Sequence, residues 1–259
     1  MQRSVNSLIG YTIGAKDGEL GKVSEFYFDD HSWTIRYLVV DTGTWLSERK
    51  VLIPHSALGQ TDWDSKTFKV NLTMDQVRNS PDTETKKTVS RQNELELFNH
   101  YGLPFYWGNV FNEGTVGMMP VVPILDTKAE KERADLTQKP KGDPHLQSSK
   151  DVVGYHINAT DGEVGHVEDY IIDDEKWNLL FLIVDTQNWL PGRKVIVSPR
   201  QIDRIDLEAE KVYINLTQES IKNSPEFNSN HEIDKDYEKV LFDHYVNAIQ
   251  PVKNEMESK

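Results

Sequence analysis

The chain has 259 residues, of which 37% are hydrophobic and 27% charged, and its formal net charge is −13. It contains no cysteine, which excludes disulfides, thiolate catalysis and cysteine-ligated zinc. No stretch approaches the roughly 20 apolar residues of a membrane span, and the N-terminus lacks a signal-peptide core. We therefore expect a cytoplasmic protein.

The charge is concentrated in the second half of the chain. Residues 151–259 hold 11 Lys and Arg against 22 Asp and Glu, whereas residues 1–101 hold 12 against 14. Direct binding of nucleic acid requires clustered cations, so it is not expected. An acidic half would suit a basic partner, although solubility alone is the commoner reason for acidic surfaces.

The chain contains one internal repeat. Shifting residues 10–101 by 144 positions places them on residues 154–245 without a gap, with about a third of the pairs identical. A repeat of this length is a whole domain. Residues kept in both copies serve something common to both, which is usually the fold; they are Gly10, Asp17, Gly18, Gly21, Asp41 and Arg49 in the first copy and Gly154, Asp161, Gly162, Gly165, Asp185 and Arg193 in the second.

Each copy is predicted to consist of short strands. β-Branched and aromatic runs separated by turn residues predict five of them in the first copy, at residues 8–13, 20–28, 34–40, 49–53 and 67–72. Their counterparts include residues 164–172, 178–184, 193–197 and 211–216. Strands at this spacing indicate a small sandwich or barrel.

Helices are predicted to follow the strands. Thr73 and Gln76 fit a capping box for a short helix over residues 74–79, and Thr217 opens a weaker one. Residues 94–101 form a second predicted helix. Its counterpart is longer, with one apolar stripe formed by Val240, Leu241, Tyr245, Val246 and Ile249.

The two copies are predicted as domains over residues 1–101 and 151–250, followed by a tail at 251–259. Residues 102–150 lie between them, an aromatic segment followed by a charged, flexible linker. The aromatic segment has no equivalent after the second copy. Phe105, Tyr106 and Trp107 either pack against a barrel or form an exposed patch, and they are the best candidates for a partner surface.

The two copies resemble the PRC-barrel family, named for the cytoplasmic domain of the photosynthetic reaction centre H subunit. The resemblance rests on Gly10-Tyr11, residues 17–23, residues 37–40 and residues 49–54, and on their counterparts in the second copy. A related barrel forms the C-terminal half of a ribosome maturation factor. The resemblance implies a mainly β protein of two tandem small barrels, each followed by short helices. It implies an adaptor fold with no common catalytic residues and no cofactor.

Other motifs carry little chemistry. Trp45 and Trp189 lie in matching loops and either fold back onto the core or anchor a partner at an exposed tip. Retention in both copies favours the first. Adjacent Asp29 and Asp30 indicate a turn rather than a metal site, because neighbours on a strand point to opposite faces. No catalytic or metal motif is recognisable, and His100 and His244 fit helix packing.

We therefore expect a non-enzymatic module that binds an unknown protein partner, with the barrels docked as a pseudo-dimer; the sequence leaves homo-oligomers open. The alternatives are a small-molecule binder or enzyme with a site between the barrels. Contacts of the photosynthetic or ribosome-assembly type follow from family analogy alone.

Overall fold

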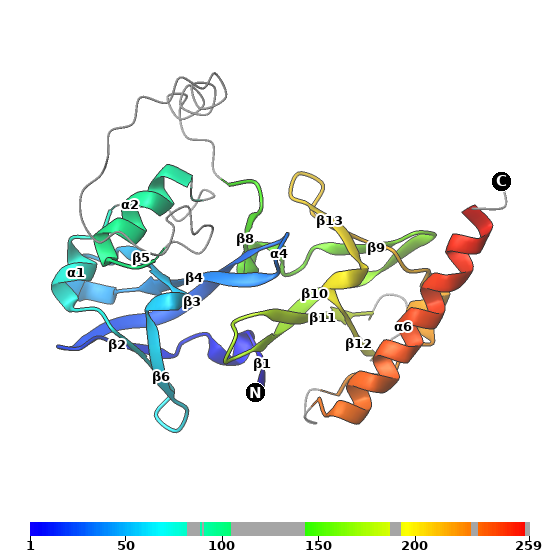
Figure 1. The fold of residues 1–259 in the computed structure, drawn as a ribbon, viewed down its shortest axis with the longest axis horizontal. Coiled ribbons are helices and arrows are strands. Elements are labelled where there is room, and N and C mark those ends of the chain that lie inside the picture. Colours follow the sequence, from blue (N-terminus) through cyan, green and yellow to red (C-terminus); the bar gives the residue numbers. More distant parts are fainter. Residues whose placement is uncertain (82–88, 90, 105–142, 187–192, 229–232, 257–259) are drawn as a thin grey trace, which may run out of the picture. The chain divides into compact units, whose positions relative to one another are not determined.

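The computed structural model describes residues 1–81, 89, 91–104, 143–186, 193–228 and 233–256 (Figure 1). Phe105, Tyr106, Trp107 and Trp189 lie outside these residues. The chain divides into two compact units. The first unit consists of Met1–Tyr11, Val23–Leu38 and Gln147–Lys259, and the second unit consists of Thr12–Lys22 and Val39–Leu146.

The first repeat forms one seven-stranded sheet with the order β5-β4-β3-β2-β7-β6, and β8 pairs with β3. Its strands are β2 (Thr12–Gly14), β3 (Glu19–Asp29), β4 (Thr34–Asp41), β5 (Lys50–Pro54), β6 (Leu58–Asp62), β7 (Thr67–Val70) and β8 (Leu146–Ser148). β2 pairs antiparallel with β3 and parallel with β7. Leu58–Asp62 was not expected as a strand, because Gly59, Gln60 and Thr61 give it no apolar alternation.

The second repeat forms a sheet with the corresponding order, β12-β11-β10-β9-β14-β13, and β1 pairs with β10. Its strands are β1 (Gln2–Ser4), β9 (His156–Ala159), β10 (Gly162–Asp173), β11 (Leu179–Asp185), β12 (Lys194–Val197), β13 (Ile202–Asp206) and β14 (Lys211–Ile214). The predicted mainly β class and tandem architecture are confirmed. Neither strand order closes on itself within the described residues, so each barrel is an open one.

Short helices join and follow the strands. They are η1 (Asn6–Leu8), η2 (Gly43–Leu46), η3 (His55–Ala57), η4 (Pro199–Gln201), α1 (Met74–Arg78), α2 (Arg91–Tyr101), α4 (Ser149–Val152) and α5 (Gln218–Lys222). The predicted capping box is present, because the Thr73 side chain accepts from the Gln76 N–H and the Gln76 side chain accepts from the Thr73 N–H. The last helix, α6 (Lys235–Met256), is long, and it extends into the residues predicted as a tail.

The strands that precede the two repeats are exchanged. β1 precedes the first repeat but pairs with β10 of the second, and β8 precedes the second repeat but pairs with β3 of the first. A shift of 144 residues converts β1 into β8, so the exchange is reciprocal. Residues 146–150, predicted as the end of a flexible linker, instead form β8 and the start of α4. Their partners lie in the other repeat, which local sequence patterns cannot reveal.

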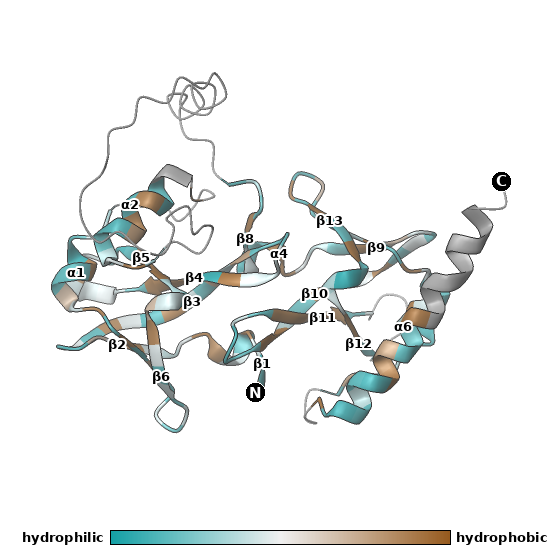
Figure 2. Ribbon diagram, viewed as in Figure 1, coloured by the Kyte–Doolittle hydropathy of each residue, from teal (hydrophilic) through white to brown (hydrophobic). Residues whose placement is uncertain are grey.

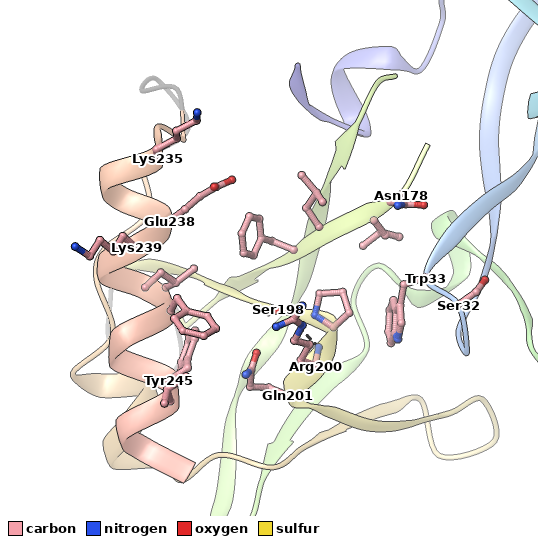
Figure 3. A pocket seen from close by; sticks show the side chains of 17 residues that line it. Ser32, Trp33, Asn178, Ser198, Arg200, Gln201, Lys235, Glu238, Lys239 and Tyr245 are labelled. Carbon is pink, nitrogen blue, oxygen red and sulfur yellow. Dashed lines mark hydrogen bonds between the residues drawn. The ribbon is translucent and has the colours of Figure 1, made fainter. Parts of the chain in front are cut away.

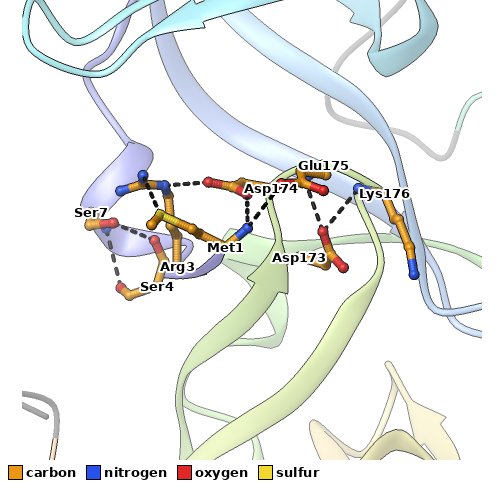
Figure 4. A network of polar contacts seen from close by, with 8 residues as sticks. All are labelled: Met1, Arg3, Ser4, Ser7, Asp173, Asp174, Glu175 and Lys176. Atoms are coloured by element: carbon orange, nitrogen blue, oxygen red, sulfur yellow. Dashed lines mark hydrogen bonds and ion pairs between the residues drawn. The ribbon is translucent and has the colours of Figure 1, made fainter. Parts of the chain in front are cut away.

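The exchanged strands are held by matching polar contacts, and Figure 4 shows contacts on the β1 side. Arg3 Nε donates to Asp174 Oδ2 at 2.6 Å, and its counterpart Gln147 donates through Nε2 to Asp30 Oδ2 at 2.7 Å. The Ser148 hydroxyl donates to Glu25 Oε2 at 2.6 Å, and the Ser4 hydroxyl donates to Asp169 in the same way.

Within the first unit the two repeats also meet through their β-hairpin turns. The Ile35 N–H donates to the Trp177 carbonyl at 2.8 Å, and the Leu179 N–H donates to the Trp33 carbonyl at 2.7 Å. Thr34 and Asn178 form an isolated antiparallel bridge at the centre. Each contact maps onto its mate under the 144-residue shift. This is the isologous pattern of a two-fold dimer, contained in one chain.

Aromatic rings from both repeats share the core of this unit. Phe26 of the first repeat stacks on Trp177 of the second, with 6.2 Å between the ring centroids. The ring centroids of Phe28 and Tyr170 lie 5.5 Å apart. Trp177 is 7% exposed. Its φ of +58° is matched by +55° at Trp33, a backbone region that bulky residues rarely adopt. The turns therefore accept backbone strain at the place where the repeats meet.

Candidate functional site

The glycines kept in both copies have a structural explanation. Gly21 and Gly165 adopt φ values of +141° and +144°. A Cβ atom at Gly21 would lie 2.0 Å from the Asp41 carbonyl oxygen, and at Gly165 it would lie 2.1 Å from that of Asp185. Only glycine allows these strands to approach so closely.

The conserved Asp-Gly turns cap helices. Asp17 Oδ1 accepts from the Met74 N–H at 2.8 Å, and Asp161 Oδ1 accepts from the Gln218 N–H at 2.7 Å. An aspartate at the start of a helix satisfies a free N–H and complements the helix dipole. These two acids therefore join the first turn of each repeat to its short helix.

Arg49 and Arg193 serve the other end of the same helices. Arg49 Nη2 donates to the carbonyls of Ser80 at 2.7 Å and Pro81 at 2.9 Å, and Arg193 Nη1 donates to the Lys222 carbonyl at 2.8 Å. A cation there satisfies carbonyls that the helix leaves unpaired. The loop ends are joined by Thr42, whose hydroxyl donates to the Arg49 carbonyl at 2.6 Å. Asp41 Oδ1 accepts from the Gly43 N–H at 2.9 Å.

Trp45, a candidate partner anchor, is half-buried and already engaged. Its indole N–H donates to the Leu20 carbonyl at 2.7 Å, and the Arg78 guanidinium lies 5.7 Å from the ring centroid. Both contacts hold the ring against its own repeat. This geometry favours the structural interpretation of Trp45.

Asp29 forms a turn, as predicted. Its carboxylate accepts from the N–H groups of His31 at 3.0 Å and Ser32 at 2.7 Å, and it pairs with the buried Arg36 at 3.0 Å. Burial alone would raise the pKa of Asp29, but the hydrogen bonds from Ser32 and His31 and the charge of Arg36 hold it below its usual value.

In each repeat the final helix is fixed by a histidine to the preceding short helix and by a tyrosine to an edge strand. His100 Nε2 contacts the Gln76 carbonyl at 2.6 Å, and His244 Nε2 contacts that of Ser220 at 2.8 Å. Tyr245 donates to the Ile196 carbonyl of β12 at 2.7 Å. Burial raises the pKa of Tyr101, its counterpart, to about 12, so that phenol stays protonated and donates to β5. Both histidines therefore have packing roles, with the short helices α1 and α5 as their partners rather than the barrel strands expected for them.

The described residues contain no group of three or more His, Cys, Asp or Glu side chains suited to a metal ion. Within the same residues, no helix combines the length and apolarity needed to cross a membrane. The kept glycine, aspartate and arginine pairs described above thus have structural roles.

A candidate site lies in the first unit, in a groove between α6, β11 and the junction of β12 and β13 (Figure 3). Its volume is about 990 Å³, at the upper end of the range for ligand sites. α6 contributes Lys235, Glu238, Lys239, Phe242 and Val246, which recur at helical spacing on one face. Trp33, from the turn of the first repeat, lies at the opposite end of the groove.

The corresponding residues of the first repeat are covered. Phe242 is 55% exposed, whereas its counterpart Phe98 is 3% exposed. Leu180 and Phe181 of β11 are half-buried, whereas Arg36 and Tyr37 of β4 are fully buried. The same positions are thus sealed in one copy and open in the other.

The copies also differ in the chemistry of this region. Gln201 replaces Ala57, Arg200 replaces Ser56 and Lys239 replaces Leu95. Gln201 is only 7% exposed, yet its Oε1 atom has no hydrogen-bond partner. A buried acceptor without a donor is costly and rare in folded proteins. The Gln201 Oε1 atom can accept a hydrogen bond from a molecule that binds beside it.

The sequence did not reveal this site. The predicted apolar stripe on α6 was only partly correct: Leu241 and Tyr245 are buried, but Val240 is 55% exposed. In Figure 2 hydrophobic and hydrophilic residues alternate along the coloured part of α6. Phe242, which lies in the groove, is matched by a phenylalanine in the first copy. The difference in exposure is a tertiary property that this match conceals.

Comparison with known proteins agrees with this architecture. The model of the PRC-barrel domain matches residues 1–77 and 148–221, more than half of the chain. No curated protein matches the sequence. Since both repeats are matched in tandem, the chain belongs to the PRC-barrel domain family.

Proposed function

We propose that this protein is a non-enzymatic adaptor whose second repeat binds a partner protein in the α6 groove. The observation that carries the proposal is the contrast between Phe242, 55% exposed, and its counterpart Phe98, 3% exposed. Among the described residues, the two copies share their fold but differ in the exposure of this surface. A large exposed aromatic side chain in a groove is a typical anchor point for a partner.

The composition is consistent with this proposal. The described residues show no metal cluster, and no catalytic motif was recognised in the sequence. A cytoplasmic location, expected from the sequence, is part of the proposal.

The test uses two residues on the same helix. Phe242 and Val240 are both 55% exposed, but only Phe242 lines the groove. The full chain, Phe242→Asp and Val240→Asp are used as bait in a lysate of the source organism, and captured proteins are quantified by mass spectrometry. Proteins lost with Phe242→Asp and retained with Val240→Asp support the proposal. An identical set with all three baits would overturn it.

A small-molecule ligand is the second candidate, because a small molecule with a hydrogen-bond donor would equally pair with the Oε1 atom of Gln201. Such a ligand would supply a hydrogen-bond donor to the groove and raise the melting temperature by binding the folded state. Screening metabolites against the wild type and Gln201→Leu tests this alternative, which requires a rise confined to the wild type.

A further inference from the structure

The rim of the α6 groove is basic within an acidic half of the molecule. Residues 151–259 carry 11 basic and 22 acidic side chains. Three of those basic side chains, Arg200, Lys235 and Lys239, line the groove, against one acid, Glu238. The Gln2 amide donates to Glu238. The local charge is therefore opposite in sign to that of the surrounding half.

These three cations are available to a partner. All three are exposed, and their charged groups make no hydrogen bond or ion pair within the described part of the chain. Lys194 and Arg204 of the same repeat, by contrast, pair with Glu168 and Asp203.

The floor of the groove requires a different group. Gln201 Oε1 accepts only from a donor, and Figure 3 shows Gln201 and Arg200 projecting into the space between α6 and Trp33. Phe181, Phe242 and Leu179 supply apolar and aromatic walls. A flat ring that carries one N–H or O–H satisfies both demands, and among amino acids only tryptophan and tyrosine combine them at this size.

We propose that the occupant is an acidic segment of the partner protein with a tryptophan or tyrosine anchor. This inference rests on the proposed adaptor function. The anchor ring lies between Phe181 and Phe242 and donates to Gln201 Oε1. Flanking carboxylates face Arg200, Lys235 and Lys239. A nucleic acid would bring phosphates but would meet the net charge of −13 along its length.

The test uses fluorescein-labelled peptides of about twelve residues, mostly Glu and Ala with one central Trp, measured by fluorescence anisotropy against the full chain. One matched peptide has Lys in place of Glu, and another has Phe in place of Trp. We expect the acidic Trp peptide to bind, the Lys peptide to bind at least tenfold more weakly, and the Phe peptide to bind about fivefold more weakly, because it lacks the donor.

Three protein variants assign the contacts. Gln201→Leu removes the acceptor and should abolish the preference for Trp over Phe while leaving the preference for acid. Arg200→Glu should weaken binding of the acidic peptide and leave the preference for Trp over Phe unchanged. Val240→Asp, outside the groove, should change neither.

Equal binding of the acidic and Lys peptides, or a Trp preference that survives Gln201→Leu, would overturn the inference. If captured proteins still depend on Phe242 in that case, the adaptor function stands and only the proposed chemistry of its partner fails. If no peptide binds but indole-3-acetate raises the melting temperature of the wild type and not of Gln201→Leu, the occupant is a small acid and the peptide proposal is wrong.

Discussion

Individual residues of this chain fall into two groups, and comparing the copies separates them. Gly21, Asp17 and Arg49 recur because strand contact and helix termini require them in each repeat. Gln201 and Arg200, which line the groove, occur in one copy only. These identical pairs therefore have structural roles, whereas Gln201 and Arg200 distinguish the groove of the second copy from the first.

Gly21→Ala should be severely destabilising. Its Cβ would lie 2.0 Å from the backbone oxygen of Asp41, so the strands must separate, at a cost of about 3 kcal/mol or more. Gly10→Ala is the control, since Gly10 also has positive φ but no atom within 4 Å of the added Cβ. That change should cost about 1 kcal/mol. Urea denaturation measures both, and equal costs would show that φ alone explains Gly21.

Gln201→Leu should stabilise the unliganded protein. Removing a buried acceptor that has no donor relieves a desolvation cost of about 1 kcal/mol. Gln147→Leu is the matched control: Gln147 is also buried, but its Nε2 donates to Asp30. This change should destabilise. Thermal unfolding distinguishes the two, and a lower melting temperature for Gln201→Leu would mean that its amide is used within the fold.

At the scale of elements, the sequence predicted the local features and missed the tertiary ones. The capping box at Thr73, the short helices and most strands depend on neighbouring residues, so their patterns were readable. β6 was missed because its residues are polar. β1 and β8 were missed because they are short strands whose partners lie in the other repeat. The groove depends on which side chains are covered by the rest of the fold. Phe98 and Phe242 match in sequence, so their difference in exposure could not be predicted from it.

The two β-hairpin turns should respond differently to acid. The lowered pKa of Asp29 means that its contribution to stability is complete above the ordinary aspartate pKa of 3.8 and is lost as the pH falls through its folded-state pKa. Asp29→Asn should make the free energy of unfolding less dependent on pH in this range. At pH 7 it should lower that free energy by about 2 kcal/mol, because Arg36 loses a buried partner.

Asp173→Asn is the internal control for this measurement. Asp173 accepts from the N–H groups of Glu175 and Lys176 in the same way, but Leu180 replaces Arg36 in the second copy. Asp173→Asn should therefore lower the free energy of unfolding by less than Asp29→Asn does. Unfolding free energies between pH 3 and pH 7 test both variants, and identical profiles would show that Arg36 contributes nothing to the Asp29 effect.

At the scale of the whole molecule, the reciprocal contacts describe a homodimer fused into one chain. This makes a prediction for the second repeat alone. A fragment of residues 143–259 carries β8 without its partner β3, and β10 without its partner β1. Since β8 corresponds to β1, the β8 of one fragment can pair with the β10 of another.

We therefore expect this fragment to form a symmetric dimer, with its hairpin turns paired as Trp33 and Leu179 are in the full chain. Light scattering after size-exclusion chromatography should give twice the fragment mass. A fragment that starts at residue 151 lacks β8 and should lose the dimer, because the exchanged strand is missing. A folded monomer of the longer fragment would contradict the prediction, since it would show that β10 needs no strand from a second repeat.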